Sequence, residues 1–274
     1  MAAQQTLKET PAETILVFDS GLGGLTVYRA IAAARPSADF VYVADDAAFP
    51  YGAMAEPALV ARVVALISEL IATHRPDLAV IACNTASTIA LPELRRTFPS
   101  LPFVGTVPAI KPACANSLTR RVSVLGTEAT VQREYTRALI RDYAGDCRVT
   151  LVGSNKLAAY AEAELIGTPV DDRTLSAEIA PCFCDDGGRT DTVVLACTHY
   201  PLVIDRLRRL APWPVKFLDP APAIARRVVD LLGPAPAPQH GGLTRAIFTS
   251  GRAPDAALAG FGIRSGHPAP TTAE

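Results

Sequence analysis

The chain carries almost no net charge and few aromatic side chains, and these shortages exclude several classes of protein. Its 274 residues include 26 Lys and Arg against 27 Asp and Glu, a formal charge of −1, and only 6% are aromatic. A nucleic-acid-binding domain or a binder of anionic membranes would show a basic excess. The longest apolar runs reach about half of the length that a membrane-spanning helix needs. We therefore expect no nucleic-acid partner and no membrane contact.

The sequence also shows no charged-then-apolar leader and no disulfide framework of the kind found in short secreted chains. Six cysteines are spread over the 274 residues. One residue separates Cys182 from Cys184, and no second Cys/His pair lies nearby at zinc-finger spacing. We therefore expect a cytoplasmic protein without a metal site. Cys114, Cys147, Cys182 and Cys184 are expected to be small packing residues.

What the sequence does contain is a regular alternation of strand-like and helix-like segments. The strand-like runs are short, rich in valine and isoleucine and continuous, which is typical of parallel strands covered on both faces. They span residues 15–18, 40–43, 78–82, 103–107, 122–125, 149–152, 193–196 and 215–218. Helical patterns lie at residues 25–34, 57–73, 85–98, 130–143, 156–165, 176–183, 201–210 and 221–232. This order predicts a doubly wound α/β fold.

A weak internal duplication predicts two similar parallel-sheet lobes, related by a pseudo-twofold axis, with the active site in the cleft between them. Phe18-Asp19-Ser20-Gly21 opens one unit and Leu125-Gly126-Thr127-Glu128 opens the other. A strand that ends in a cysteine closes each unit. The expected bounds are residues 14–107 with 219–262 for the first lobe, 108–218 for the second, and 1–13 and 263–274 for flexible tails.

Two cysteines end apolar runs in matching contexts. Cys83 follows one run and Cys197 follows the other. The next residues are Asn84 and Thr85 in the first case, and Thr198 and His199 in the second. Each thiol is expected at a helix N-terminus, where the helix dipole would lower its pKa from about 8.5. Two sulfur acid/bases facing one substrate suit the transfer of a proton from one face of a carbon to the other.

Asp19 and Ser20 precede a glycine-rich turn that is not a nucleotide fingerprint. The letters GLGG do not fit G-x-G-x-x-G, and no Walker lysine follows. Two interpretations stay open: Asp19 caps a helix after a tight turn, or Asp19 and Ser20 face a ligand. In the second case Asp19 and His199 are candidate proton partners of Cys83 and Cys197.

The candidate residues converge on one edge of the predicted sheets. Ligands of parallel sheets bind beyond the carboxyl ends of the strands. Residues expected there are Asp19, Ser20, Cys83, Asn84, Thr127, Cys197, Thr198 and His199. Pro50-Tyr51-Gly52 forms a turn after another strand, where a packed tyrosine and a ligand contact are about equally favoured.

Longer stretches match a known family over residues 15–251. They read FDSGLGGLTVY (18–28), FPYG (49–52), ACNTAST (82–88), VGTVPAIKPA (104–113), GSNKLAAYAEAEL (153–165), VLACTHYPL (194–202), LDPAPAIARR (218–227) and FTSG (248–251). On these motifs the sequence resembles the cofactor-independent glutamate racemases of the aspartate/glutamate racemase family. The resemblance implies interconversion of L- and D-glutamate, and a supply of D-glutamate for peptidoglycan synthesis.

The resemblance also implies roles for individual residues. Cys83 with Asp19 would serve the D isomer, and Cys197 with His199 the L isomer, without any cofactor. The substrate would be held by Asp19, Ser20, Tyr51, Gly52, Asn84, Thr85, Thr127, Thr130, Glu162, Thr198 and His199, with Glu162 placed near His199. Members of the family are often homodimers, and the sequence leaves the oligomeric state open.

Two alternatives stay beside this interpretation. The first is a racemase of a related substrate, aspartate or a hydantoin; the histidine after Cys197-Thr198 favours glutamate, since a carboxylate there would favour aspartate. The second is a non-catalytic amino-acid-binding module that uses the interlobe cleft. Such a module has no need of paired thiols.

Overall fold

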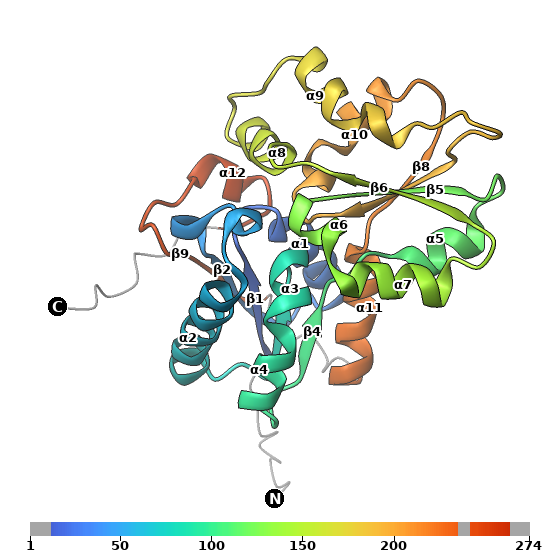
Figure 1. The fold of residues 1–274 in the computed structure, drawn as a ribbon. Coiled ribbons are helices and arrows are strands. Elements are labelled where there is room, and N and C mark those ends of the chain that lie inside the picture. Colours follow the sequence, from blue (N-terminus) through green and yellow to red (C-terminus); the bar gives the residue numbers. More distant parts are fainter. Residues whose placement is uncertain (1–11, 235–241, 264–274) are drawn as a thin grey trace, which may run out of the picture.

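The computed structural model describes residues 12–234 and 242–263, which form two parallel sheets with helices on both faces (Figure 1). The first sheet has the order β4-β3-β1-β2-β9 and the second the order β6-β5-β7-β8. The strands of the first sheet are β1 (Thr14–Asp19), β2 (Asp39–Ala44), β3 (Leu78–Ile81), β4 (Phe103–Gly105) and β9 (Thr244–Phe248). Those of the second are β5 (Arg121–Gly126), β6 (Arg148–Gly153), β7 (Thr192–Ala196) and β8 (Lys216–Leu218). The predicted fold class is confirmed.

The first sheet is covered on both faces because its central strand is apolar at its four middle positions, residues 15–18. In β1, Ile15 and Val17 pack into one core, and Leu16 and Phe18 pack into the other. The first core is completed by α1 (Gly24–Ala34) and α11 (Ala221–Leu232). The second is completed by α2 (Glu56–His74), α3 (Asn84–Ile89) and α4 (Leu91–Thr97). Period-two alternation along a strand therefore supplies two separate cores.

The second sheet repeats this arrangement with two cores of its own. Leu125, Val193 and Leu195 pack with helices α8 (Leu157–Leu165), α9 (Asp172–Ile179) and α10 (Ile204–Leu210). Val122 and Val194 pack with α5 (Ile110–Asn116) and α7 (Glu134–Tyr143) on the opposite face. A short helix, α6 (Glu128–Gln132), follows β5.

The chain returns to the first sheet after β8. Pro220 precedes α11, whose Ile224 and Val228 pack in a core of the first sheet. The predicted lobe bounds, 14–107 with 219–262 and 108–218, stay a prediction, and residues 235–241 within them lie outside the described residues. Of the predicted tails, residues 1–11 and 264–274 lie outside the described residues. Glu13 and Ile263 are packed: the Glu13 carbonyl accepts a hydrogen bond from the Asp39 N–H, and Ile263 is buried.

Several predicted helices are broken in the structure. The segment 85–98 forms α3 and α4, separated at Ala90, because the N–H that Pro92 lacks weakens a continuous helix. The segment 130–143 forms α6 and α7, separated by extended backbone at Arg133. Short 3-10 turns occupy Asp46–Ala48, Tyr51–Ala53, Ala180–Cys182 and Tyr200–Val203. Strand β9 and helices α5 and α12 (Asp255–Ala259) were not predicted from the sequence.

Helix α2 is longer than expected from the sequence, in which the apolar runs reach about half of a membrane span. Its 19 residues have a mean hydropathy of 1.4, enough by length and composition to cross a membrane. One side of α2 packs on the first sheet through Leu59, Val63 and Ile67. Arg62 on the same helix binds the buried carboxylate of Asp45. Packing accounts for the apolar residues on this side of α2, with 22% of the apolar window buried, and the absence of membrane contact stays a prediction.

Candidate active site

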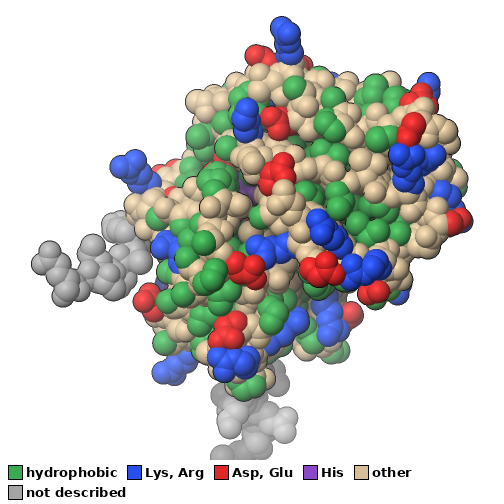
Figure 2. Space-filling view, in the orientation of Figure 1, with side chains coloured by type: hydrophobic (Ala, Val, Ile, Leu, Met, Phe, Trp, Pro, Cys, Tyr) green, Lys and Arg blue, Asp and Glu red, His purple; other side chains and the backbone are tan. Residues whose placement is uncertain are grey.

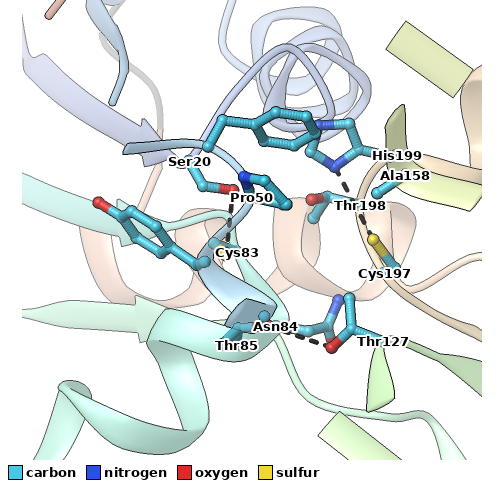
Figure 3. A pocket seen from close by; sticks show the side chains of 13 residues that line it. Ser20, Pro50, Cys83, Asn84, Thr85, Thr127, Ala158, Cys197, Thr198 and His199 are labelled. Atoms are coloured by element: carbon cyan, nitrogen blue, oxygen red, sulfur yellow. Dashed lines mark hydrogen bonds between the residues drawn. The ribbon is translucent and has the colours of Figure 1, made fainter. Parts of the chain in front are cut away.

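One cavity lies where strands of both sheets end (Figure 3). It is lined by Ser20, Phe49, Pro50, Tyr51, Gly52, Cys83, Asn84, Thr85, Thr127, Ala158, Cys197, Thr198 and His199. All the residues predicted for the site line it except Asp19, Thr130 and Glu162, which lie behind its wall. Phe49, Pro50 and Ala158 were not predicted. Phe49 and Pro50 belong to the FPYG motif and Ala158, on α8, to the GSNKLAAYAEAEL motif, but the sequence assigned a role to none of the three.

Cys83 enters the cavity from the first sheet. It immediately precedes α3, as predicted, and its Sγ lies 3.7 Å from the Ser20 hydroxyl. Burial, and next the negative charge of Asp19, raise the pKa of the Cys83 thiol well above its ordinary value. The expectation of a lowered pKa is thus wrong for Cys83. Desolvation outweighs the dipole of a six-residue helix.

Cys197 enters the same cavity from the end of β7 in the second sheet. Its Sγ lies 3.8 Å from Nδ1 of His199 (Figure 3). The predicted helix N-terminus is wrong here, because a 3-10 turn at Tyr200–Val203 precedes α10. His199, rather than a helix dipole, is the polar group placed to act on this sulfur.

Asp19 fits the first of the two interpretations that the sequence left open, since it binds the start of a helix and does not itself line the cavity. Its carboxylate accepts hydrogen bonds from the N–H groups of Ser20 at 2.7 Å and of Gly24, the first residue of α1, at 2.5 Å. Thr198, from the second sheet, donates to it over 3.4 Å. Burial raises the pKa of Asp19, although the charge of His199 opposes the shift. Asp19 caps α1 and also supports the residues on both sides of the cavity.

His199 and Glu162 join the two sheets. Glu162 Oε1 accepts the Leu22 N–H at 2.6 Å and lies 2.8 Å from His199 Nε2, so Glu162 does lie beside His199. Burial alone would lower the pKa of His199. The hydrogen bonds to Cys197 and Glu162 and the charges of Cys197 and Asp19 outweigh burial and raise this pKa well above its ordinary value. This direction favours the protonated imidazole.

A group of threonine hydroxyls forms another side of the cavity. Thr127 caps α6 by accepting the Thr130 N–H at 3.1 Å, and the two hydroxyls lie 2.9 Å apart. Thr85, from α3 of the first sheet, lies 3.4 Å from Thr127 and 3.5 Å from Thr130. Thr130 is fully buried and does not line the cavity, but its hydroxyl lies beside those of Thr85 and Thr127, which do.

Asn84 presents a side-chain amide without protein partners. The residue is 2% exposed, and within the described ranges neither its amide oxygen nor its amide nitrogen has a hydrogen-bond partner. Leaving such a group unpaired costs about 1–3 kcal/mol. An amide that lines a cavity in this state is suited to a polar ligand, to which it offers both a donor and an acceptor. Among the described residues no group of His, Cys, Asp or Glu has the arrangement of a metal site.

The raised pKa of His199 predicts how Glu162→Gln will change stability with pH. Because the pKa is higher in the folded than in the unfolded protein, the stabilisation is fully present below about pH 6.5 and is lost as the pH rises through the folded value. We expect Glu162→Gln to lower the free energy of unfolding by about 1–3 kcal/mol at pH 6. The loss should be smaller at pH 9. Urea unfolding at both pH values measures this difference.

Glu164→Gln is the matched control for this measurement. Glu164 lies on the same helix, α8, and its partner is Arg206, which does not titrate in this range. Its loss should be equal at the two pH values. Equal losses for Glu162→Gln as well would contradict the charged His199–Glu162 pair.

The fold and the site together define a class: α/β enzymes with two parallel sheets that present paired thiols to one cavity. Residues 15–228 match the model of the family described as Asp/Glu/Hydantoin racemase. The chain belongs to this family.

Named relatives and solved structures agree with this family membership. The chain is 55% identical over 262 residues to a glutamate racemase of Brucella canis, covering 93% of this chain and 94% of the relative. It is similar to the crystal structure of Escherichia coli glutamate racemase in complex with L-glutamate and the activator UDP-MurNAc-Ala, with a TM-score of 0.85, 38% identity and coverage of 94% and 98%. A glutamate racemase of Thermus thermophilus in complex with β-chloro-D-alanine matches with a TM-score of 0.68, 28% identity and coverage of 95% and 97%.

Proposed function

We propose that this protein interconverts L-glutamate and D-glutamate by two-base proton transfer at Cα, without a cofactor. The observation that carries the proposal is the pair of thiols, Cys83 and Cys197, which line one cavity from different sheets. The relatives from Brucella and Escherichia coli support glutamate as the substrate. A single base tends to return a proton to the face from which it came, so inversion favours two bases.

In the direction from L to D, the Cys197 thiolate removes the Cα proton and the Cys83 thiol delivers a proton to the opposite face. The protonated His199, 3.8 Å from Cys197, stabilises the thiolate that acts as the base. The raised pKa of Cys83 keeps that sulfur protonated, which is the form that the delivery step needs. In the reverse direction the two sulfurs exchange roles, and the Cys83 thiol must first give up its proton. Its Sγ lies 3.7 Å from the Ser20 hydroxyl, which lies 3.4 Å from the Asp19 carboxylate, the acceptor that we assign to this proton.

The carbanion between the two transfers needs electrostatic stabilisation. Donors fixed in place inside a site from which water is excluded supply it. Ser20, Asn84, Thr85, Thr127 and Thr198 line the cavity with hydroxyl and amide groups. We assign these groups to the substrate carboxylates, and Thr130, Asp19 and Glu162 to the support of Thr127, Thr198 and His199.

The wider role follows from the reaction. D-Glutamate is a component of peptidoglycan, so the product would serve cell-wall synthesis. We place the protein in the cytoplasm, where such precursors are made. A homodimer, which is common in the family, stays a prediction. The substrate is the proposed partner, and neither nucleic acid nor a membrane is required for the reaction.

The test is to incubate the purified protein with D-glutamate in ²H₂O without any added cofactor. We expect the circular dichroism of D-glutamate to decay to zero, with deuterium incorporated only at Cα. The same assay is run with D-aspartate and with a chiral hydantoin. Decay with one of these and none with glutamate would favour the related-substrate alternative. Calorimetric binding of glutamate with no exchange would favour the binding module.

A further inference from the structure

Asp45 is a fully buried carboxylate that the proposed reaction does not use. It is the first residue after β2, and its backbone N–H donates to the Asp19 carbonyl at 2.8 Å. Such a buried charge is tolerated only where hydrogen bonds and an opposite charge compensate for the lost water. The four donors of Asp45 come from three separate parts of the chain.

Arg62, in the middle of α2, donates through Nε and Nη2 to the two carboxylate oxygens, each at 2.6 Å. The Tyr51 hydroxyl donates at 2.5 Å, and the Thr249 hydroxyl donates at 2.6 Å. Burial alone would raise the pKa of Asp45, but these donors outweigh burial and lower it, so the carboxylate stays ionised at neutral pH.

The donors of Asp45 fix both ends of the segment 47–51, which leads into one wall of the cavity. This wall comprises Pro50, Tyr51 and Gly52. At one end of the segment, Thr249 Oγ1 accepts the Ala47 N–H at 3.1 Å. At the other end, the bond to Asp45 fixes the Tyr51 side chain. Since its hydroxyl is occupied, Tyr51 offers the cavity its ring and backbone.

We propose that Asp45 is a positioning residue for the Pro50–Gly52 wall, and that the hydroxyl of Thr249, from the segment after β9, completes the hydrogen bonding of the Asp45 carboxylate. This inference rests on the proposed function. The wall lies beside the cavity. The proton partners have hydrogen bonds of their own, Asp19 to Gly24 and His199 to Glu162, and the contact nearest to the wall is that of Phe49 with the His199 ring, at 5.1 Å between ring centroids. Loosening the wall should therefore weaken the binding of both enantiomers and leave the proton transfers nearly unchanged.

Thr249 offers a test with isosteric and conservative variants. Thr249→Val keeps the shape and removes the hydroxyl, and we expect it to raise KM for L- and D-glutamate alike by about fivefold to twentyfold. The change in kcat should stay below about threefold, because the reacting groups do not move. Thr249→Ser keeps the hydroxyl and should retain the KM of the wild-type protein. Circular dichroism in both directions gives KM and kcat for each variant.

Ser250→Ala is the matched control. Ser250 is the next residue, and its hydroxyl binds Asp46 instead of Asp45. This variant should leave KM within twofold of the wild type. The proposal is overturned if Thr249→Val also stays within twofold, if Ser250→Ala gives the same rise, or if Thr249→Ser behaves like Thr249→Val.

A second variant keeps the test decisive if Thr249→Val does not fold, which thermal unfolding would reveal. Arg62→Lys replaces two hydrogen bonds to Asp45 with one, on a side chain that is 35% exposed. A rise in KM with little change in kcat supports the proposal, and an unchanged KM overturns it. A wild-type protein inactive on glutamate would instead refute the proposed function, so the two failures are distinguishable.

Discussion

Replacing Cys197 with serine is expected to lower kcat for the conversion of L- to D-glutamate by about 10²–10⁴-fold, the usual contribution of a positioned acid or base. Serine has nearly the same shape, but its hydroxyl is far less acidic than a thiol and supplies no base at neutral pH. Cys83→Ser should cause a loss of the same order, because one turnover uses both sulfurs. Circular dichroism of each enantiomer measures both directions.

Two further variants test whether the loss of activity is specific to the pair Cys83 and Cys197. Cys184→Ser removes a thiol that lies near Thr150 on β6 and does not line the cavity, and its activity should stay within about twofold of the wild type. The double variant Cys83→Ser/Cys197→Ser should be about as inactive as either single one, since residues that act as a unit have non-additive effects. A single variant that keeps more than about a tenth of the activity would remove the basis of the two-base mechanism.

The fold was readable from the sequence because buried parallel strands leave a strong signal. Runs such as residues 15–18 and 193–196 are apolar at every position, and each is a strand in the structure. β9 was missed because its sequence, Thr-Arg-Ala-Ile-Phe, buries only Ala246 and Phe248, while Ile247 on the other face is partly buried. It is an edge strand, and a face that is only partly covered leaves a weaker pattern than two buried faces.

The sequence predicted where the site residues would lie, but not which way their side chains would point. A strand-end pattern indicated Asp19, Cys83 and Cys197, and the structure brings both thiols to one cavity. The strand-end pattern could not indicate that the carboxylates of Asp19 and Glu162 would lie behind the wall of the cavity. There they accept hydrogen bonds from backbone N–H groups of the glycine-rich turn. Which way a side chain points after a strand depends on tertiary packing, which local sequence does not record.

The pKa of the Cys83 thiol and the role of Asp45 also depend on tertiary packing, so the local sequence did not predict them. The local sequence favoured a lowered thiol pKa, whereas burial by residues distant in the chain raises it. Asp45 meets Thr249 across 204 positions of sequence. The FPYG motif lies near Asp45 and the FTSG motif contains Thr249, but nothing in the sequence indicated that the two motifs meet. Only the fold shows that one carboxylate connects them.

Gly23→Ala is expected to lower kcat/KM by about 10²-fold, although it adds only a methyl group. A Cβ at Gly23 would lie 2.5 Å from His199 Nδ1, 2.6 Å from its backbone N and 2.7 Å from its Cγ. At such distances His199 must shift. Because its backbone is in contact, the shift extends toward Thr198 and Cys197. An error of about 1 Å in the placement of a reacting group has an effect of this size.

The effect of Gly23→Ala should come from His199 and not from strain in the glycine-rich turn. Gly23 has φ −60° and ψ −37°, a conformation that alanine adopts freely. Gly260→Ala is the matched control: its φ is −61°, and the nearest atom to its Cβ is the Ala257 carbonyl oxygen at 3.4 Å. That variant should keep its activity. Thermal unfolding would show whether Gly23→Ala remains folded, and a folded, fully active variant would mean that the reaction does not depend on where His199 lies.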